Sequence, residues 1–174
     1  MSEYIFTGRA LVITDDSKKL ISDIDTDQIF HNAHLHITDI NEMGQHSFGN
    51  LEGWKDFPQI AQSGDVVIAG ENFGSGSSRQ QAVDCFRALD VKLIIASSFG
   101  AIYKRNAINT GFPILVSQEI ENLVSQGKIK HLQKIQVDLL SGKLENLDTG
   151  DVYDITPFSK VQKDIFDKGT LLRI

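Results

Sequence analysis

Continuous apolar runs along the chain predict a set of buried strands. Four runs of strand length stand out, at residues 10–13, 66–69, 91–96 and 114–116. Such runs are typical of strands that are covered on both faces, as they are in a parallel sheet. The second and third runs flank a segment with helical spacing, so we expect them to form a βαβ unit with parallel strands.

Apolar residues spaced three and four apart predict the helices. The clearest helix follows the second strand and starts near Ala82. Further helices are expected at residues 54–61, 99–109, 119–125 and 158–169. In the last of them, Val161 and Ile165 fall on one face, with Phe166 adjacent to it.

Apolar and polar residues alternate late in the chain, as they do in half-buried strands. Residues 135–139 and 143–147 flank a Ser-Gly turn and predict a hairpin, and a further strand is expected at residues 152–155. Together with the βαβ core, these strands predict an α/β fold with additional antiparallel strands. The length of 174 residues fits a single domain that spans residues 1–174.

The segment between the first two apolar runs has a weaker pattern. Residues 24–30 mix acids with apolar residues, which favours a short strand or a strand edge. Residues 31–53 are densely polar and have poor periodicity, so we expect a long loop with one short helix. Long loops in compact domains are often functional, which makes this segment a candidate for part of a site.

Composition and charge narrow the class of protein. The chain is 41% hydrophobic and 23% charged, which is ordinary for a globular protein. A net charge of −6 argues against a nucleic-acid partner. No apolar run reaches the roughly 20 residues needed to cross a bilayer, and the N-terminus does not resemble a signal peptide. We therefore expect a cytoplasmic protein without a membrane partner.

The chain contains a single cysteine, Cys85. One cysteine can form no internal disulfide, and it is too few for an iron–sulfur cluster, which takes several thiolates. Cys85 lies within a predicted helix, so a small buried side chain is the favoured interpretation over a reactive thiol. Any cluster that the chemistry needs must come from another chain.

The candidate chemistry gathers in residues 70–82, a glycine-rich turn between a strand and a helix. Its three glycines allow positive φ angles and a close approach of the backbone to a ligand. We expect Ser77 or Ser78 to cap the following helix, whose first N–H groups would attract an anion. Arg79 adds a planar fork that suits a carboxylate or a phosphate.

Nucleotide-binding motifs do not fit this turn. A dinucleotide fingerprint requires a third glycine where Arg79 stands, and an acid that residues 93–98 lack. A phosphate-binding P-loop requires a lysine that the turn does not contain. The alternative is a purely structural turn, in which the glycines only allow the backbone to bend. A structural turn would not need two serines and an arginine clustered at the start of a helix.

Three segments resemble the motifs of one family. The first is Gly-x-Asn-Phe-Gly-x-Gly-Ser-Ser-Arg at residues 70–79, and the second is Asp-Thr-Asp-Gln-Ile at residues 25–29. The third begins with Ser98-Phe99 and continues through Asn106 to Gly111, with Pro113 after it. They resemble, in the family's order, the swivelling domain of the aconitase superfamily. In particular they look like the 3-isopropylmalate dehydratase small-subunit family. The span that they bracket covers about half of the chain.

The resemblance implies a swivelling β/β/α domain and a definite chemistry. Members dehydrate and rehydrate a hydroxy-di- or tricarboxylic acid and thereby move its hydroxyl to the neighbouring carbon. A [4Fe–4S] cluster on a separate large subunit binds that hydroxyl, and the small subunit, inactive alone, completes the site. By position, Ser77 matches the catalytic base, Arg79 binds a substrate carboxylate with Ser78 beside it, and Asp27 joins the catalytic hydrogen-bond network.

Physical chemistry agrees with these implied roles. A serine hydroxyl is a weak base, so its anion needs strong local stabilisation before it can take a proton from carbon. Helix-start N–H groups and the guanidinium of Arg79 are suited to provide it. For Asp27, a structural role at a turn or strand end remains an alternative, and we interpret Asp25 as structural.

The sequence departs from the family pattern in two places. Gln80 and Gln81 stand where the family commonly has Glu-His. The loop that senses the distinguishing group of the substrate corresponds to residues 34–37, and His36 stands where tricarboxylate-using relatives carry an arginine. With Leu35 and Ile37 around it, His36 favours an apolar substituent over a third carboxylate.

The leading hypothesis is therefore the small subunit of a hydro-lyase that interconverts 3- and 2-isopropylmalate in leucine biosynthesis. Homoaconitate, dimethylmalate and methylcitrate are alternative substrates. A non-catalytic carboxylate-binding module is an alternative of a different class. A zinc site formed by the histidines of residues 31–46 is disfavoured, because their spacing is irregular and solvated loop histidines explain them more simply.

Overall fold

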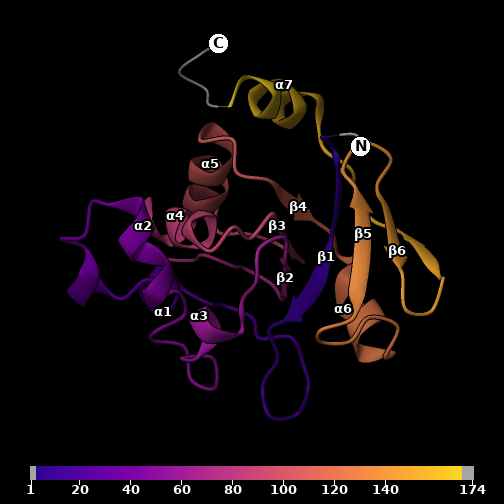
Figure 1. The fold of residues 1–174 in the computed structure, drawn as a ribbon, viewed down its shortest axis with the longest axis horizontal. Helices are drawn as coiled ribbons and strands as arrows, with labels where there is room; N and C mark the ends of the chain where they lie inside the picture. The colour runs from indigo at the N-terminus through magenta and orange to yellow at the C-terminus, as the bar shows by residue number, and fades with distance from the viewer. Residues whose placement is uncertain (1–2, 170–174) are drawn as a thin grey trace.

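The computed structural model describes residues 3–169 and is built on one seven-stranded sheet (Figure 1). The strands follow the order β4-β3-β2-β1-β5-β6-β7 across the sheet. Their bounds are β1 Ile5–Val12, β2 Val66–Ala69, β3 Leu93–Ala96, β4 Ile114–Val116, β5 Lys134–Asp138, β6 Lys143–Asn146 and β7 Val152–Asp154. Each of the four apolar runs and each of the three late segments from which a strand was predicted contains or overlaps one of these seven strands.

Strand β1 belongs to both halves of the sheet. Its last part pairs in parallel with β2, with Leu11 opposite Val67, and β2 and β3 continue the parallel register to β4. Its first part pairs antiparallel with β5, with Phe6 opposite Val137, and β5, β6 and β7 form an antiparallel meander. The prediction of a βαβ core with additional antiparallel strands is confirmed.

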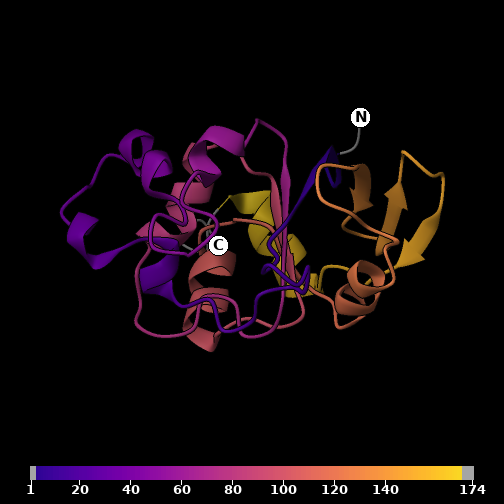
Figure 2. The same cartoon turned by 90° about the horizontal axis from the view of Figure 1, so that it is seen from below.

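Helices cover the parallel strands on both faces, which explains why these strands are apolar without alternation. Helices α4 (Gln81–Ala88) and α5 (Ala101–Asn109) pack against one face, around Val67 and Ile94. Helix α6 (Glu119–Ser125) and the inner face of β5 and β6 pack against the other, around Ile68. Figure 2 shows these layers from below, with the late strands and α6 on the side away from α1 to α5.

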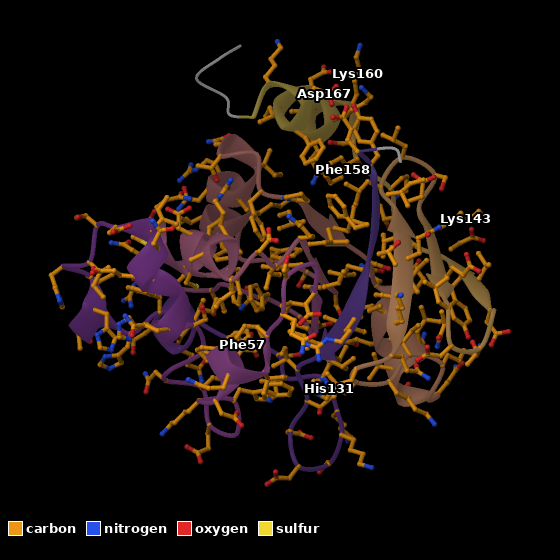
Figure 3. The ribbon with its side chains drawn as sticks, viewed as in Figure 1. Phe57, His131, Lys143, Phe158, Lys160 and Asp167 are labelled. Atoms are coloured by element: carbon orange, nitrogen blue, oxygen red, sulfur yellow. The ribbon has the colours of Figure 1, made fainter. Side chains whose placement is uncertain are left out.

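Helix α7 (Lys160–Lys168) lies across the far end of β1 and β5 (Figure 1), and Figure 3 labels Phe158 beneath it. It starts with a capping box between Ser159 and Gln162. Ile165 is buried, and the ring of Phe166 packs against the rings of Tyr4, just before β1, and of Phe6 in β1. Val161 lies one turn before Ile165 on the same side of α7, as expected, but it is 64% exposed, so this face is buried only around Ile165.

Residues 26–29 form a short helix, and the strand expected over residues 24–30 is wrong apart from one isolated parallel bridge between Asp25 and Ser75. Helix α1 (Thr26–Ile29) starts with a capping box in which the backbone N–H of Gln28 donates to the Asp25 carboxylate at 2.8 Å. The Gln28 side chain accepts in return from the backbone N–H of Asp25 at 3.0 Å. The signature Asp-x-x-Gln was visible in the sequence, but the mixture of acids and apolar residues obscured it. Asp25 is therefore structural, as interpreted.

The polar segment 31–53 is a folded loop rather than an open one. It contains more short helices than the one expected, namely η1 Asn32–His34, α2 Ile40–Met43 and η2 Gly44–His46. Phe48 anchors the loop, because its side chain is fully buried and its N–H donates to the Ile29 carbonyl at 2.8 Å. Helix α3 (Phe57–Ile60) follows and is shorter than the expected 54–61. No helix of residues 3–169 is long and apolar enough to cross a membrane.

A buried ion pair joins β1 to the turn before β2. The guanidinium of Arg9 donates to both carboxylate oxygens of Asp65, at 3.0 and 2.7 Å, and also to the Ile60 carbonyl. Asp65 is almost completely buried. Removing one partner of such a pair leaves an uncompensated charge in a medium of low dielectric constant.

We therefore expect Arg9→Met to lower the free energy of unfolding by about 2 to 4 kcal/mol, measured by urea denaturation. Arg105→Met, which removes an exposed arginine from α5, is the matched control and should change stability by less than about 0.5 kcal/mol. Equal effects of the two substitutions would contradict a structural role of the Arg9–Asp65 pair.

Candidate functional site

The glycine-rich turn between β2 and α4 is fixed by backbone conformations that only glycine adopts without strain. Gly74 has a φ angle of 78°, and a side chain on it would lie 2.2 Å from the ring of Tyr103. The backbone of Phe73 exchanges hydrogen bonds with the turn after β3, accepting from Gly100 and donating to Ser98. The turn is thus held directly against the start of α5.

Helix α1 docks on the same turn. The backbone N–H of Thr26 donates to the Ser75 carbonyl at 2.8 Å, and the Thr26 hydroxyl donates to the Ser77 carbonyl at 2.9 Å. The N–H of Gly74 donates to the Ile24 carbonyl at 2.7 Å. These contacts bring two motifs together that lie about fifty residues apart in the sequence.

Arg79 connects side chains of the two motifs. Its Nη1 donates to Oδ1 of Asp27 at 3.0 Å and to the Phe30 carbonyl at 2.8 Å, and its Nη2 donates to the Ser77 hydroxyl at 3.3 Å. The Arg79 side chain is only 11% exposed. Three of the residues singled out from the sequence, Asp27, Ser77 and Arg79, therefore form one hydrogen-bonded cluster, which we call the Asp27–Arg79 cluster.

The long loop supplies further partners to Asp27. The N–H of Asn32 donates to Oδ1 at 2.9 Å, the Asn50 amide donates to Oδ2 at 3.0 Å, and Nε2 of His31 lies 4.0 Å from Oδ2. The hydrogen bond from Arg79 lowers the pKa of the Asp27 carboxyl most, followed by that from Asn32. Sequence reasoning did not identify Asn32 or Asn50, and only the general expectation of a functional long loop pointed to them.

Ser78 faces a different neighbour. Its hydroxyl accepts a hydrogen bond from the Asn106 amide of α5 at 3.0 Å. Neither Ser77 nor Ser78 caps α4, because the helix starts at Gln81 and its N-cap residue is Gln80, which makes no side-chain cap. The capping prediction is therefore wrong. The contact between the Ser77 carbonyl and α1 holds both serines ahead of the helix, where their hydroxyls are available for other partners.

The proposed specificity loop is tied to helix α4 through Gln81. The Gln81 amide donates to the Leu35 carbonyl at 3.2 Å, so the loop is tied to the first turn of α4. The side chains of Leu35 and His36 are both exposed. In the described part of the chain, no hydrogen bond joins either side chain to Ser77 or Arg79.

The loop histidines stack rather than surround a common point. The rings of His34 and His46 lie 3.8 Å apart at an angle of 21°. Burial lowers the pKa of His46, and the neighbouring His34 and His36 lower it further. Within residues 3–169, no group of three or more histidine, cysteine or acidic side chains is arranged to hold a metal ion.

Cys85 does not fit a cluster ligand. Its side chain is fully buried in α4, as expected from the sequence, and burial raises its pKa to about 12. A metal ligand must be a thiolate, which this environment disfavours strongly. The residues of this chain are therefore unsuited to hold an iron–sulfur cluster themselves.

The Asp27–Arg79 pair predicts a pH-dependent contribution to stability. Because the folded-state pKa of Asp27 is lowered, its contribution is present above the unfolded-state value of about 3.9 and is lost as the pH falls through the folded-state value. Asp27→Asn should lower the free energy of unfolding by up to about 1 kcal/mol at pH 7, a small effect because the Asp27 carboxylate is partly solvated. The difference from the unsubstituted chain should shrink below about pH 4.

Urea denaturation between pH 3 and 7 measures this difference. Asp16→Asn, in the exposed turn after β1, is the matched control. A stability difference for Asp27→Asn that does not change with pH would show that the carboxylate charge does not matter to the pair.

Comparison with known proteins supports the similarity suggested by the motifs. Residues 13–119 match the family model described as the aconitase C-terminal domain. A 3-isopropylmalate dehydratase small subunit from Caldicellulosiruptor bescii is 36% identical over 168 residues, covering 97% of this chain and 93% of the relative. One from Aquifex aeolicus is 38% identical over 154 residues, covering 88% of each chain.

A solved structure extends the similarity to three dimensions. The crystal structure of a 3-isopropylmalate dehydratase from Methanocaldococcus jannaschii superposes with a TM-score of 0.82 at 31% identity, over 97% of this chain and 92% of that one. The fold class predicted from the sequence is therefore confirmed. With its matching domain, its relatives and this structural neighbour, the chain belongs to the 3-isopropylmalate dehydratase small-subunit family of the aconitase superfamily.

Proposed function

We propose that this chain is the small subunit of a two-subunit hydro-lyase that interconverts 3- and 2-isopropylmalate by dehydration and rehydration. The observation that carries the proposal is the Asp27–Arg79 cluster, in which a serine hydroxyl and a carboxylate share one nearly buried guanidinium. The names of the relatives supply the substrate. The whole of residues 1–174 would then act as one swivelling domain.

Ser77 is suited to exchange a proton with a carbon atom of the substrate. In dehydration, the C–H bond next to a carboxylate would break and its proton would bond to the Ser77 oxygen, while the electron pair forms the C=C bond and the neighbouring carbon loses its hydroxyl as hydroxide. In rehydration, the Ser77 proton would add to the carbon that lost the hydroxyl, and hydroxide would add to the carbon that lost the proton. The alkoxide required for this exchange is costly in water. The N–H of Arg79 that already points at the Ser77 oxygen supports it, because a preorganised cationic donor stabilises a negative charge without reorganisation.

Arg79 retains donors for a substrate carboxylate. Among the described residues, Asp27 and the Phe30 carbonyl occupy Nη1, and Ser77 takes one N–H of Nη2. Of the five guanidinium N–H groups, one on Nε and one on Nη2 remain, and together they can bind a carboxylate through two hydrogen bonds. Ser78, oriented by Asn106, lies next to this fork in sequence and adds a hydroxyl. Asp27 holds the guanidinium in place.

A partner subunit must complete the site. We assign the [4Fe–4S] cluster to that large subunit, since the single buried thiol of this chain does not suit it. On the partner, the cluster would supply Lewis acidity toward the substrate hydroxyl. The small subunit alone would be inactive, because it binds and deprotonates but does not activate the leaving hydroxyl.

We expect Ser77→Ala to lower kcat by about a thousandfold or more while KM changes only a few-fold, because Arg79 and Ser78 still bind the substrate. The measurement is interconversion of 2- and 3-isopropylmalate by the complex with a cluster-bearing large subunit. Ser141→Ala, in the distant turn between β5 and β6, is the control and should leave kcat unchanged.

Two outcomes would contradict this assignment. Unchanged turnover of Ser77→Ala would remove Ser77 from the chemistry. Failure of any cluster-bearing subunit to bind the chain would favour a non-catalytic carboxylate-binding module on the same turn.

The loop at residues 34–37 should set the preference between substrates. His36→Arg adds a permanent cation where a third carboxylate would lie. The ratio of kcat/KM for a tricarboxylate such as homoaconitate to that for 3-isopropylmalate should then rise by tenfold or more, about 1.4 kcal/mol. Thr38→Arg, two residues along the same exposed loop, is the matched control. Equal ratios for the two variants would show that His36 does not face the substrate.

A further inference from the structure

The third sequence motif, residues 98–113, reaches the candidate site through one side chain. Asn106, in the middle of α5, donates from its side-chain amide to the Ser78 hydroxyl at 3.0 Å. Ser78 lies between Ser77 and Arg79 in the chain. The three motifs therefore meet at residues 77–79, where Asp27 contacts Arg79 and Asn106 contacts Ser78.

Helix α5 holds Asn106 in a fixed position. One turn before it, the fully buried Tyr103 donates from its hydroxyl to the Ala82 carbonyl of α4 at 2.9 Å. One turn after it, the Thr110 hydroxyl donates to the Asn106 carbonyl at 2.8 Å and accepts from the Gln80 amide at 3.4 Å. Helix α5 is thus tied to α4 on both sides of Asn106 (Figure 1). A side chain on a helix fixed in this way is positioned more precisely than one on a loop.

The two neighbouring serines receive different donors. The Ser77 hydroxyl accepts from the guanidinium of Arg79 at 3.3 Å, and this donor carries a permanent charge. The Ser78 hydroxyl accepts from the neutral amide of Asn106. Hydrogen bonds from a charged donor are about twice as strong as neutral ones, so the guanidinium stabilises an alkoxide far better than the amide does. The donors therefore favour the alkoxide at Ser77 and leave Ser78 protonated.

The amide of Asn106 also decides where the Ser78 proton points. A serine hydroxyl has one proton and two lone pairs. Because an N–H of Asn106 occupies a lone pair on the side of α5, the O–H bond must point away from that helix. Among residues 3–169, no acceptor takes this proton, and Ser78 is exposed. Ser78 thus offers a donor on the outer side of the turn.

A carboxylate is the ligand group that suits this donor. A carboxylate only accepts hydrogen bonds, whereas an amide or a hydroxyl would also bring its own protons against the donors of the site. Arg79, the next residue, retains one N–H on Nε and one on Nη2, as counted above. The Ser78 hydroxyl therefore adds a third donor to a set that already favours an anion.

We propose that Asn106 is a positioning residue, which keeps the Ser78 hydroxyl turned outward as a donor to a substrate carboxylate. Asn106 acts only through Ser78 and touches neither the substrate nor the reacting atoms. The inference rests on the proposed function for the identity of the substrate, whereas the role of Asn106 requires only a carboxylate ligand. It assigns the third motif to substrate binding and not to proton transfer.

Asn106→Leu removes the amide and keeps a neutral side chain of similar size. In the complex with a cluster-bearing large subunit, we expect KM for 3-isopropylmalate to rise about three- to tenfold while kcat stays within about twofold, because the lost hydrogen bond orients a binding group. Ser77→Ala has the opposite pattern. Asn122→Leu, at an exposed position of α6, is the matched control and should change neither constant.

A double-variant cycle tests whether Asn106 acts through Ser78. Ser78→Ala should raise KM by about tenfold, the effect of losing a hydrogen bond to a charged group. Adding Asn106→Leu should raise KM no further, because the hydroxyl that the amide orients is then absent. Asn106→Asp is a second variant of the same size. Its carboxylate would draw the Ser78 proton inward and repel the substrate, so KM should rise more than in Asn106→Leu.

Malonate binding to the full chain separates this inference from the proposed function. The backbone amide signals of Gly76 and Ser78 in NMR spectra should shift saturably with malonate. We expect the Kd to be about threefold or more higher for Asn106→Leu than for Asn122→Leu. This readout needs neither a large subunit nor turnover, so it decides the role of Asn106 even where Ser77→Ala leaves turnover unchanged and the proposed function fails.

Three results would overturn the proposal. An unchanged KM in both Asn106 variants, or a fall of kcat at constant KM, would remove Asn106 from substrate binding. An equal rise of KM from Asn106→Leu with and without the Ser78 hydroxyl would give Asn106 a structural role only. The absence of a saturable malonate shift in the unsubstituted chain, or equal malonate affinities of the two leucine variants, would separate the Asn106–Ser78 contact from carboxylate recognition.

Discussion

The ion pair between Asp27 and Arg79 is the interaction on which the candidate site depends. A guanidinium with 11% exposure needs an anionic partner close by, because an unpaired buried charge is costly. Asp27 provides it, and the same carboxylate also accepts hydrogen bonds from Asn32 and Asn50. One side chain thus joins three segments, the glycine-rich turn, α1 and the long loop. Arg79 then holds the Ser77 hydroxyl within reach of a cationic N–H.

This ion pair is possible because the parallel strands deliver the segments to one edge of the sheet. The turns that follow β2 and β3 meet through the backbone of Phe73, and α1 adds its own backbone contacts to the same turn. Gly74 is essential to this geometry, since any side chain there would overlap the ring of Tyr103. The glycines therefore serve close packing against α5 as well as access to a ligand. The apolar sheet is the rigid support that keeps the polar groups in register.

Features that depend on residues close together in the sequence could be predicted, whereas features that depend on contacts between distant segments could not. The strands were predictable because burial on both faces requires continuous apolar runs, as in β2 and β3. Helix α1 was missed although its capping box is local, because acids among apolar residues resemble an edge strand as well. The roles of Asn32 and Asn50 were not predictable, since their hydrogen bonds to Asp27 depend on how a loop without periodicity folds. The serine caps were predicted wrongly because a contact with distant Thr26 delays the helix.

The departure of this chain from the family pattern has a structural meaning at Gln81. The amide of Gln81 donates to the backbone carbonyl of Leu35, and so links the first turn of α4 to the loop that would face the substrate. A histidine at the same position can gain or lose a proton near neutral pH, whereas an amide stays neutral throughout. The link therefore holds the loop without placing a variable charge beside Arg79. The neutral amide thus keeps this link unchanged across the pH range in which a histidine would titrate.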